Sequence, residues 1–340
     1  MKFSNVKTLI FIGGGDLMLA TMLVAREKGF LVGAVLAPRH ADEIVESGDT
    51  LIVAIEKKKF PVCVEKSGAD IDPTKLGEAF ANALAICFGP AWIFPNAVLD
   101  RFPKGMVNFN GIPIPHYLGG AHYTWQILND YRCGGCHIQY ITDDVDRGDL
   151  LMSETFELSE NALIPDDYFR ENQAFANGFL GSFLDKLVAG AEFDRRPFED
   201  VNDDRLYYPR LITTENGWID WSWSGKQIDA FCRAFGSPYK GASTFYNGRR
   251  IFLKQVKFVT DSTHADFHPF CFGLIVRCTT KSAYVAVKGG LLQIDAYEFD
   301  ASEDTNSKLR EGNRFYTDTQ KLEQSRIYRP QISSNGEVGS

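Results

Sequence analysis

Two amide side chains and one carboxylate in the middle of the chain have the types and the spacing for chemistry. Asn108 and Asn110 follow an apolar segment, and Asp146 lies 38 positions beyond Asn108 in an acidic loop that closes on Gly148. An asparagine N–H group can stabilise the negative charge that develops on a carbonyl oxygen. A carboxylate can accept a proton or hold water and polar groups in place. We therefore predict that Asn108 and Asp146 belong to one catalytic site.

The segments that must position these residues predict an α/β fold. Apolar runs of strand length alternate with helical segments, and glycines mark several of the turns. This alternation is typical of a doubly wound, mostly parallel sheet of the Rossmann-like kind. Open sheets of this kind bind ligands beyond the carboxyl ends of their strands, where Asn108 lies. The predicted strands are residues 8–12, 31–36, 84–88 and 106–109, and the predicted helices are 16–27, 122–129 and 167–189.

A change of pattern near residues 191–206 predicts a second domain. Acidic and turn-forming residues fill this stretch, and beyond it short alternating strands are separated by turns at Asn247-Gly248 and Gly289-Gly290. Regular short strands of this type indicate a small β-barrel of the OB kind. We therefore divide the chain into a catalytic domain, an OB-like domain and a C-terminal extension with a flexible end, at residues 1–198, 205–300 and 301–340.

Composition narrows the class of protein. Hydrophobic residues make up 44% of the 340 residues, as in a globular protein. The sequence contains no run of 18 apolar residues, which is the length needed to span a membrane. The N-terminal apolar run is too short for a secretion signal, so a cytoplasmic protein is expected. The net charge is −8, from 36 basic and 44 acidic residues, which argues against a general nucleic-acid binder.

Two short motifs suggest other functions and are better explained as turns. Cys133-Gly134-Gly135-Cys136 has redox or metal spacing, but a zinc site would need a second ligand pair that the sequence lacks. We therefore predict a turn at these glycines and no metal. Gly13–Gly15 leaves a nucleotide-dependent oxidoreductase open, although the third glycine of a dinucleotide fingerprint would fall on Met18. A tight strand-to-helix turn accounts for this triple glycine better.

Several motifs resemble those of the folate-dependent formyltransferases. The hallmark of that family is an Asn-x-His pair after a strand, a Pro-x-Tyr-x-Gly loop, and an Asp-x-Gly loop further on. The corresponding segments here are Asn108–Asn110, Pro115–Gly119 and Asp146–Gly148. Trp218–Trp221 and Pro238–Ala242 are similar to the linker and the C-terminal entry segment of the two-domain members. Asn110 stands where the family places its catalytic histidine.

The resemblance implies an N-formyltransferase that uses N10-formyltetrahydrofolate as its co-substrate. It makes Asn108, Asn110 and Asp146 the catalytic residues. A flat pterin ring needs an apolar slot with converging backbone polar groups, and two segments match the family's folate site. These are Phe88, Gly89, Pro90, Ala91, Trp92 and Ile93 in the first segment, and Ile141, Thr142, Asp143 and Asp144 in the second.

The resemblance also implies an acceptor, the primary amine of a small molecule. Tyr208-Pro209-Arg210 resembles the branch that formylates amino sugars on nucleotide carriers more than the branch that formylates methionyl-tRNA. The acidic stretch 42–49 would repel a phosphate backbone. We expect a nucleotide-linked amino sugar as the substrate, and a homodimer is left open. Substrate contacts are expected from His116, Tyr117, His122, Tyr208, Arg210 and Trp221.

Asn110 leaves the route of the proton open, because an amide does not titrate near neutral pH. In one interpretation Asp146 carries the proton itself and Asn110 is a second hydrogen-bond donor to the oxyanion. In another, His116 or His122 supplies the imidazole. In a third, the protein is a catalytically impaired homologue that binds folate or sugar without transferring the formyl group.

Overall fold

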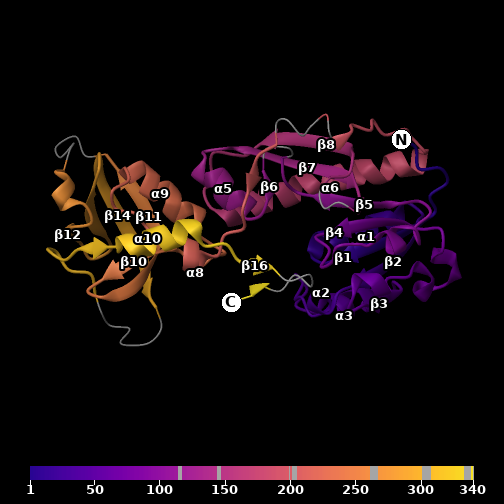
Figure 1. The fold of residues 1–340 in the computed structure, drawn as a ribbon, viewed down its shortest axis with the longest axis horizontal. Helices are drawn as coiled ribbons and strands as arrows, with labels where there is room; N and C mark the ends of the chain where they lie inside the picture. Colours follow the sequence, from indigo (N-terminus) through magenta and orange to yellow (C-terminus); the bar gives the residue numbers. More distant parts are fainter. Residues whose placement is uncertain are drawn as a thin grey trace.

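The computed structural model describes residues 1–113, 117–143, 147–198, 200, 205–260, 267–300, 308–332 and 338–339. They form two bodies, a mostly parallel sheet with its helices and a smaller antiparallel β-barrel (Figure 1). The N-terminus lies in the sheet body, and the chain returns from the barrel so that its last strands lie between the two bodies in this view. The predicted fold class, an α/β domain followed by a small barrel, is confirmed.

The first sheet has seven strands, and the five that follow one another from its first edge are parallel. The sixth strand runs antiparallel to the fifth, and the seventh runs antiparallel to the sixth, so the sheet is mixed at that edge. The chain order reverses between β1 and β4, which makes their carboxyl ends a natural place for a ligand. In spatial order the strands are β3 (Val62–Val64), β2 (Leu31–Leu36), β1 (Thr8–Gly13), β4 (Leu84–Phe88), β5 (Met106–Asn110), β7 (Cys133–Tyr140) and β8 (Leu150–Glu157).

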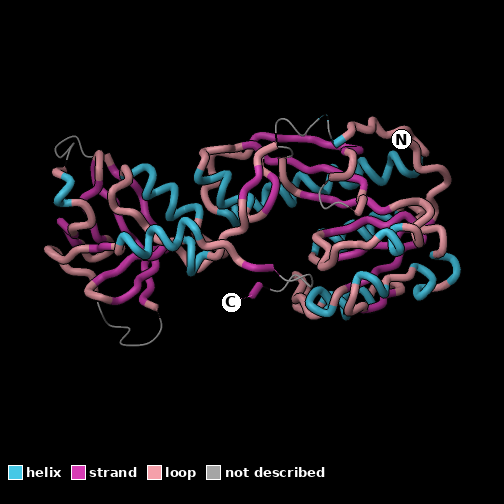
Figure 2. The backbone as a smooth tube through the Cα atoms, in the orientation of Figure 1, coloured by secondary structure: helices cyan, strands magenta, loops and turns pink. Residues whose placement is uncertain are grey.

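Helices cover both faces of this sheet. On one face α1 (Asp16–Glu27) and the long α6 (Pro165–Ala189) pack on the largest apolar core, and α6 runs along β7 (Figure 2). On the other face lie three short 3₁₀ helices and α4 (Asn96–Leu99), over a second core. Parallel strands are buried on both faces in this way, and every residue of β1 and β4 is buried. The remaining helices of this body are α2 (Pro38–Ala41), α3 (Leu51–Lys57), α5 (His122–Leu128), η1 (Gly68–Asp70), η2 (Pro73–Leu76) and η3 (Glu78–Phe80).

The second sheet curls into a barrel. Its six strands are antiparallel, and an isolated bridge between Leu274 and Arg314 joins the first strand to the last. The helix α9 (Gly225–Ala234) begins in a capping box at Ser224 and Gln227, and it packs on β11. The strands are β12 (Ile275–Cys278), β13 (Ala283–Val287), β14 (Gly290–Phe299), β11 (Arg249–Val259), β10 (Ala242–Tyr246) and β15 (Phe315–Tyr316). Smaller elements are β6 (Leu118–Gly119), β9 (Tyr207–Tyr208), β16 (Gln331–Ile332), β17 (Val338–Gly339), α8 (Thr213–Asn216), α10 (Thr319–Ile327) and η4 (Pro269–Cys271).

The turn predicted at the glycines between Cys133 and Cys136 is wrong, because this segment is the first half of β7. The glycines are needed for close packing across the sheet. A Cβ on Gly134 would lie 2.3 Å from the Phe156 ring, and one on Gly135 would lie 3.1 Å from the Cα of Pro113. The chain turns earlier, at Asp130, where φ is 51°. All seven cysteines are free thiols.

The C-terminal part of the chain contributes to the barrel. Strand β15 lies beyond residue 300 and pairs with β10, and α10 packs against α8. The division at 1–198, 205–300 and 301–340 stays a prediction. Of the tail predicted to be flexible, residues 333–337 and 340 lie outside the described residues, and β17 pairs with β16. Within the described ranges, no helix is both long enough and apolar enough to cross a membrane.

Candidate active site

Asn108 and Asn110 lie on β5 at the carboxyl edge of the sheet. They are two positions apart, so both side chains lie on the same face, opposite Gln139 and His137 of β7. The Oδ1 atom of Asn108 is buried and has no hydrogen-bond partner within the described part of the chain. Leaving such a group without a partner costs about 1–3 kcal/mol, so a ligand or water is expected to complete this contact.

Asn110 contacts an imidazole that the sequence analysis did not predict. Its Nδ2 lies 3.3 Å from Nε2 of His137, and Nδ1 of His137 lies 3.4 Å from the carbonyl oxygen of Ile112. His137 is completely buried, and this burial, together with the nearby His122, lowers its pKa to about 4. The ring is therefore neutral at physiological pH. Position 110, where the family resemblance predicts a histidine, is an asparagine. The imidazole that contacts it, His137, comes from the neighbouring strand β7.

His122 is a second neutral imidazole close to this pair. It begins α5 and makes a hydrogen bond to the backbone of Tyr117, while its buried Nδ1 atom has no partner among the described residues. Burial, with a smaller contribution from the charge of Arg210, lowers the pKa of His122 to about 4. A neutral ring of this kind can accept a proton or a hydrogen bond from a ligand.

A cavity of about 720 Å³ opens at the carboxyl ends of β1, β4 and β5. We call it the acceptor cavity. Its walls include Gly14, Gly15, Gly89 and Asn110, together with the charged residues Asp16, Arg39, Glu43 and Glu46. Glu43 lies directly over the glycine loop, since a Cβ on Gly14 would be 2.6 Å from its carboxylate. Burial lowers the pKa of His40, another wall residue, to about 4, so the titratable groups of this wall carry a net negative charge.

A second cavity, of about 540 Å³, lies between the two segments predicted to bind folate. We call it the folate cavity. Trp92 and Ile93 from the first segment and Asp143 from the second line it. Nδ2 of Asn96 donates a 3.1 Å hydrogen bond to Asp143 and so ties the segments together. Ile93 is 62% exposed and available to a ligand, whereas Trp92 packs in the core with only 8% of its surface exposed.

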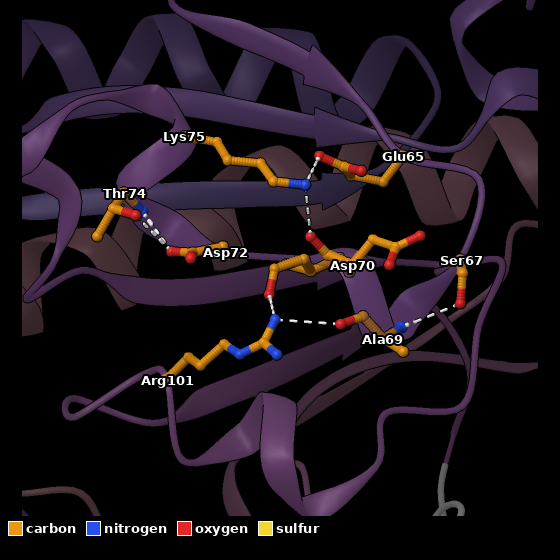
Figure 3. Close-up of polar contacts among 9 residues, drawn as sticks. Glu65, Ser67, Ala69, Asp70, Asp72, Thr74, Lys75 and Arg101 are labelled. Carbon is orange, nitrogen blue, oxygen red and sulfur yellow. Dashed lines mark hydrogen bonds and ion pairs between the residues drawn. The ribbon is translucent and has the colours of Figure 1, made fainter.

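The outer wall of the folate cavity is residues 67–69, and a polar network fixes it (Figure 3). Arg101 donates hydrogen bonds to the carbonyl oxygens of Ala69, at 3.1 Å, and of Ile71, at 2.6 Å. Lys75 joins Glu65 to the carbonyl oxygen of Asp70, at 2.8 Å in both contacts. A rigid wall of this kind is typical of a preformed ligand site.

Part of the predicted site lies outside the residues that the structure describes, namely Asp144, Asp146 and His116. The end of the loop that carries Asp146 is described. Gly148 packs so closely that a Cβ would lie 1.5 Å from the carbonyl oxygen of Tyr140, and Nε2 of Gln139 donates to the Gly148 carbonyl at 2.6 Å. The glycine of the Asp-x-Gly motif is therefore required by packing. Gln139, like His137, is a site residue that the sequence analysis missed.

Two of the expected substrate residues form an aromatic cluster. The rings of Tyr117 and Tyr208 stack with centroids 4.9 Å apart, and Nδ2 of Asn129 donates to both hydroxyl groups. Trp125 donates to the carbonyl oxygen of Pro209 at 2.8 Å. The cluster fixes the linker between the domains to the loop that follows β5. Exposed Arg210 lies beside it, next to Gly120.

Trp221 does not belong to the site, and this prediction is corrected. Its ring stacks on Phe315 with centroids 5.4 Å apart, and its Nε1 donates a 2.9 Å hydrogen bond to Thr244. It is 8% exposed within the core of the barrel.

Among the described residues, no group of three metal-binding side chains is close enough to hold a metal ion.

The structure is an α/β domain with an amide-rich strand end and an appended barrel. The family model described as "Formyl transferase" matches residues 7–166, and the one described as "Formyl transferase, C-terminal domain" matches residues 211–308. Together these matches cover more than half of the chain. The protein belongs to the formyl transferase family and is a folate-dependent formyltransferase.

Known proteins are similar to this chain in sequence or in structure. The methionyl-tRNA formyltransferase of Acetivibrio thermocellus is 28% identical over 222 residues, which are 62% of this chain and 64% of that protein. The N-formyltransferase of Helicobacter canadensis, solved with folinic acid and dTDP-3-aminofucose, superposes with a TM-score of 0.63 at 13% identity, covering 86% of this chain and all of that one. WlaRD, a sugar 3N-formyl transferase solved with dTDP and 5-N-formyl-THF, gives a TM-score of 0.61 at 11% identity, covering 88% and 99% of the two chains.

Proposed function

We propose that this protein transfers the formyl group of N10-formyltetrahydrofolate to the primary amine of a small acceptor, a nucleotide-linked amino sugar. The neutral amine nitrogen attacks the formyl carbon and forms the new C–N bond. The bond between the formyl carbon and N10 then breaks, the amine loses a proton, and N10 gains one. The products are the formamide and tetrahydrofolate.

The buried Oδ1 of Asn108 is the observation that carries this proposal. This atom is a buried acceptor without a described partner, on the strand whose end, at Asn110, lines the acceptor cavity. A half-turn about the Cβ–Cγ bond exchanges the oxygen and the nitrogen of this amide, so that the same position presents an N–H group to a formyl oxygen. An N–H donor aimed at a developing oxyanion lowers the barrier most in a buried place such as this.

Cavity size and position support a small acceptor. The acceptor cavity, at about 720 Å³, is within the range that holds small ligands. The acidic groups Asp16, Glu43 and Glu46 on its wall oppose a nucleic-acid backbone at this place. One similar solved protein is named a sugar 3N-formyl transferase and another was solved with dTDP-3-aminofucose, which supports an amino sugar here.

The same carboxylates favour a second class of acceptor. The wall carries Asp16, Glu43 and Glu46 against Arg39, and a net negative wall attracts a ligand that bears a second positive charge. A diamine or a basic amino acid has this property. A nucleotide-linked sugar would have to place its phosphates outside this cavity.

A panel of amines separates these acceptors. Purified protein is incubated with N10-formyltetrahydrofolate and with nucleotide-linked amino sugars, diamines or basic amino acids, and tetrahydrofolate release is measured. Turnover of the sugars is expected. Glu43→Gln is the matched variant: it should raise the KM of a cationic acceptor and leave that of a sugar nearly unchanged. No turnover of any amine by folded protein that binds folate in calorimetry would contradict the proposal.

A further inference from the structure

The imidazole of His137 lies directly behind the catalytic amide. Asn110 and His137 are opposite partners on the antiparallel strands β5 and β7, and their side chains meet at 3.3 Å. His137 has no exposed surface, while Asn110 is partly exposed and lines the acceptor cavity. A ligand in that cavity can therefore touch the amide, and the amide separates it from the ring.

The hydrogen bonds of His137 determine which nitrogen carries the proton. Its Nδ1 faces the carbonyl oxygen of Ile112, which can only accept a hydrogen bond, so Nδ1 is protonated and donates. Nε2 of the neutral ring is then an acceptor, and the group it faces must be a donor. That group is Nδ2 of Asn110. The opposite orientation of the amide would place two acceptors against each other.

We propose that His137 is a positioning residue that fixes the amide orientation of Asn110, so that Oδ1 of Asn110 is free to accept a hydrogen bond from the acceptor amine. The inference rests on the proposed function and adds a residue to it. Asn110 lines the acceptor cavity, and no described residue donates a hydrogen bond to its Oδ1, so this atom is open to a ligand there. A hydrogen bond from the amine to Oδ1 holds its lone pair toward the formyl carbon.

In this arrangement, orienting the amine and accepting its proton are functions of different residues, whereas a single histidine could perform both. Asn110 orients the nucleophile and takes no proton, because an amide does not titrate. His137 takes no proton from the substrate either, since it is enclosed behind Asn110. The proton must leave by another group, for which Asp146 is the predicted carrier. A half-turn of the amide would present its NH₂ group to the amine and oppose attack.

Two variants of similar size test the positioning role in turnover. Glutamine can donate to Ile112 and accept from Asn110, whereas leucine can do neither. We expect His137→Leu to lower kcat by about 10²-fold with the KM of both substrates changed less than about threefold. His137→Gln should stay within about fivefold of the wild type. His268→Gln, on the exposed part of the barrel, is the matched control. Equal kcat values in the Leu variant and the wild type would overturn the inference.

A second readout does not need turnover. In protein with ¹⁵N-labelled histidine and asparagine, His137 should show the Nδ1–H tautomer from pH 6 to 8. The side-chain amide of Asn110 should exchange slowly in the wild type and in His137→Gln, and faster in His137→Leu. An Nε2–H tautomer, or unchanged Asn110 exchange in the Leu variant, would overturn the positioning role. If no amine is formylated yet these spectra appear as expected, the proposed function fails and the pairing stands.

Discussion

Asn96 and Asp143 are 47 positions apart in sequence and are joined by a 3.1 Å hydrogen bond between their side chains. The bond connects the loop after β4 to the loop after β7, and both loops contribute to the folate cavity. Because β7 runs antiparallel to β5, its carboxyl end lies beside the amino end of β5, and the loop after β7 meets the segment after β4 through this contact.

Removing this contact should weaken folate binding. An exposed hydrogen bond to a carboxylate contributes about 1 kcal/mol, so Asn96→Ala is expected to raise the folate KM or Kd about fivefold with kcat nearly unchanged. Asn96→Asp is the matched variant, since it places two carboxylates together and should have a larger effect. Folate titration by calorimetry measures both. An unchanged Kd in both variants would place folate elsewhere.

Asn108 is expected to act in the transition state. Asn108→Ala removes the amide that faces the predicted oxyanion and should lower kcat by about 10²–10³-fold, with little change in KM. Asn108→Asp retains the shape but supplies a carboxylate that repels the oxyanion, so its loss should be at least as large. Steady-state kinetics on protein with an unchanged circular dichroism spectrum provides the measurement. A loss confined to KM would argue against an oxyanion role.

The proton carrier is tested at Asp146. Asp146→Asn should lower turnover by about 10²–10⁴-fold, the range for loss of a positioned acid–base group. His122→Ala is the comparison, because this neutral, buried imidazole is the described alternative. If the Asp146 variant is active and the His122 variant is not, the assignment is wrong.

Asn110→His tests the amide itself. A large gain in rate would mean that the natural site is catalytically impaired, and a loss would mean that the site is adapted to an asparagine at this position.

Buried neutral histidines should make the protein sensitive to acid. The pKa of His137 is about 4 in the folded protein, against 6.5 for an ordinary histidine. As pH falls below 6.5 the unfolded chain takes up a proton before the folded one does, so stability is full above pH 7 and falls toward pH 4. We expect His137 alone to remove about 2 kcal/mol between pH 7 and pH 5. The free energy of unfolding can be measured with urea at both pH values. Its loss between pH 7 and pH 5 should be smaller in His137→Gln than in the wild type, and the same as in the wild type in His268→Gln.

Much of the fold could be predicted from local pattern. Strands β2 and β4 and helix α1 match the predicted bounds, because the apolar runs and the glycines that end them agree there. Strand β8 was not predicted, since it is buried at one end and exposed at the other and shows no clear alternation. The segment Cys133–Cys136 was misinterpreted because glycines also occur in strands where a neighbour packs closely.

The site residues that belong to a sequence motif were predicted. Those whose role depends on how two strands pair were missed. Asn108 and Asn110 were found because they follow a strand within a recognisable motif. His137 was missed because its role depends on the register of β5 against β7, which places it opposite Asn110. The available signal was the alternation of polar His137 and Gln139 with apolar Cys136, Ile138 and Tyr140. Trp221 was misassigned because a motif match does not show which face of the chain a side chain occupies.

The bridge between Leu274 and Arg314 has a consequence for synthesis of the protein. The barrel closes only when β15 pairs with β10 and when this bridge joins it to the first strand. Residue 316 must therefore leave the ribosome before closure, although β10 to β14 are complete by residue 299. Until then two strand edges are open to pairing with other chains. A fragment that ends at residue 300 would keep them open permanently and should aggregate during expression, whereas one that ends after α10 should stay monodisperse.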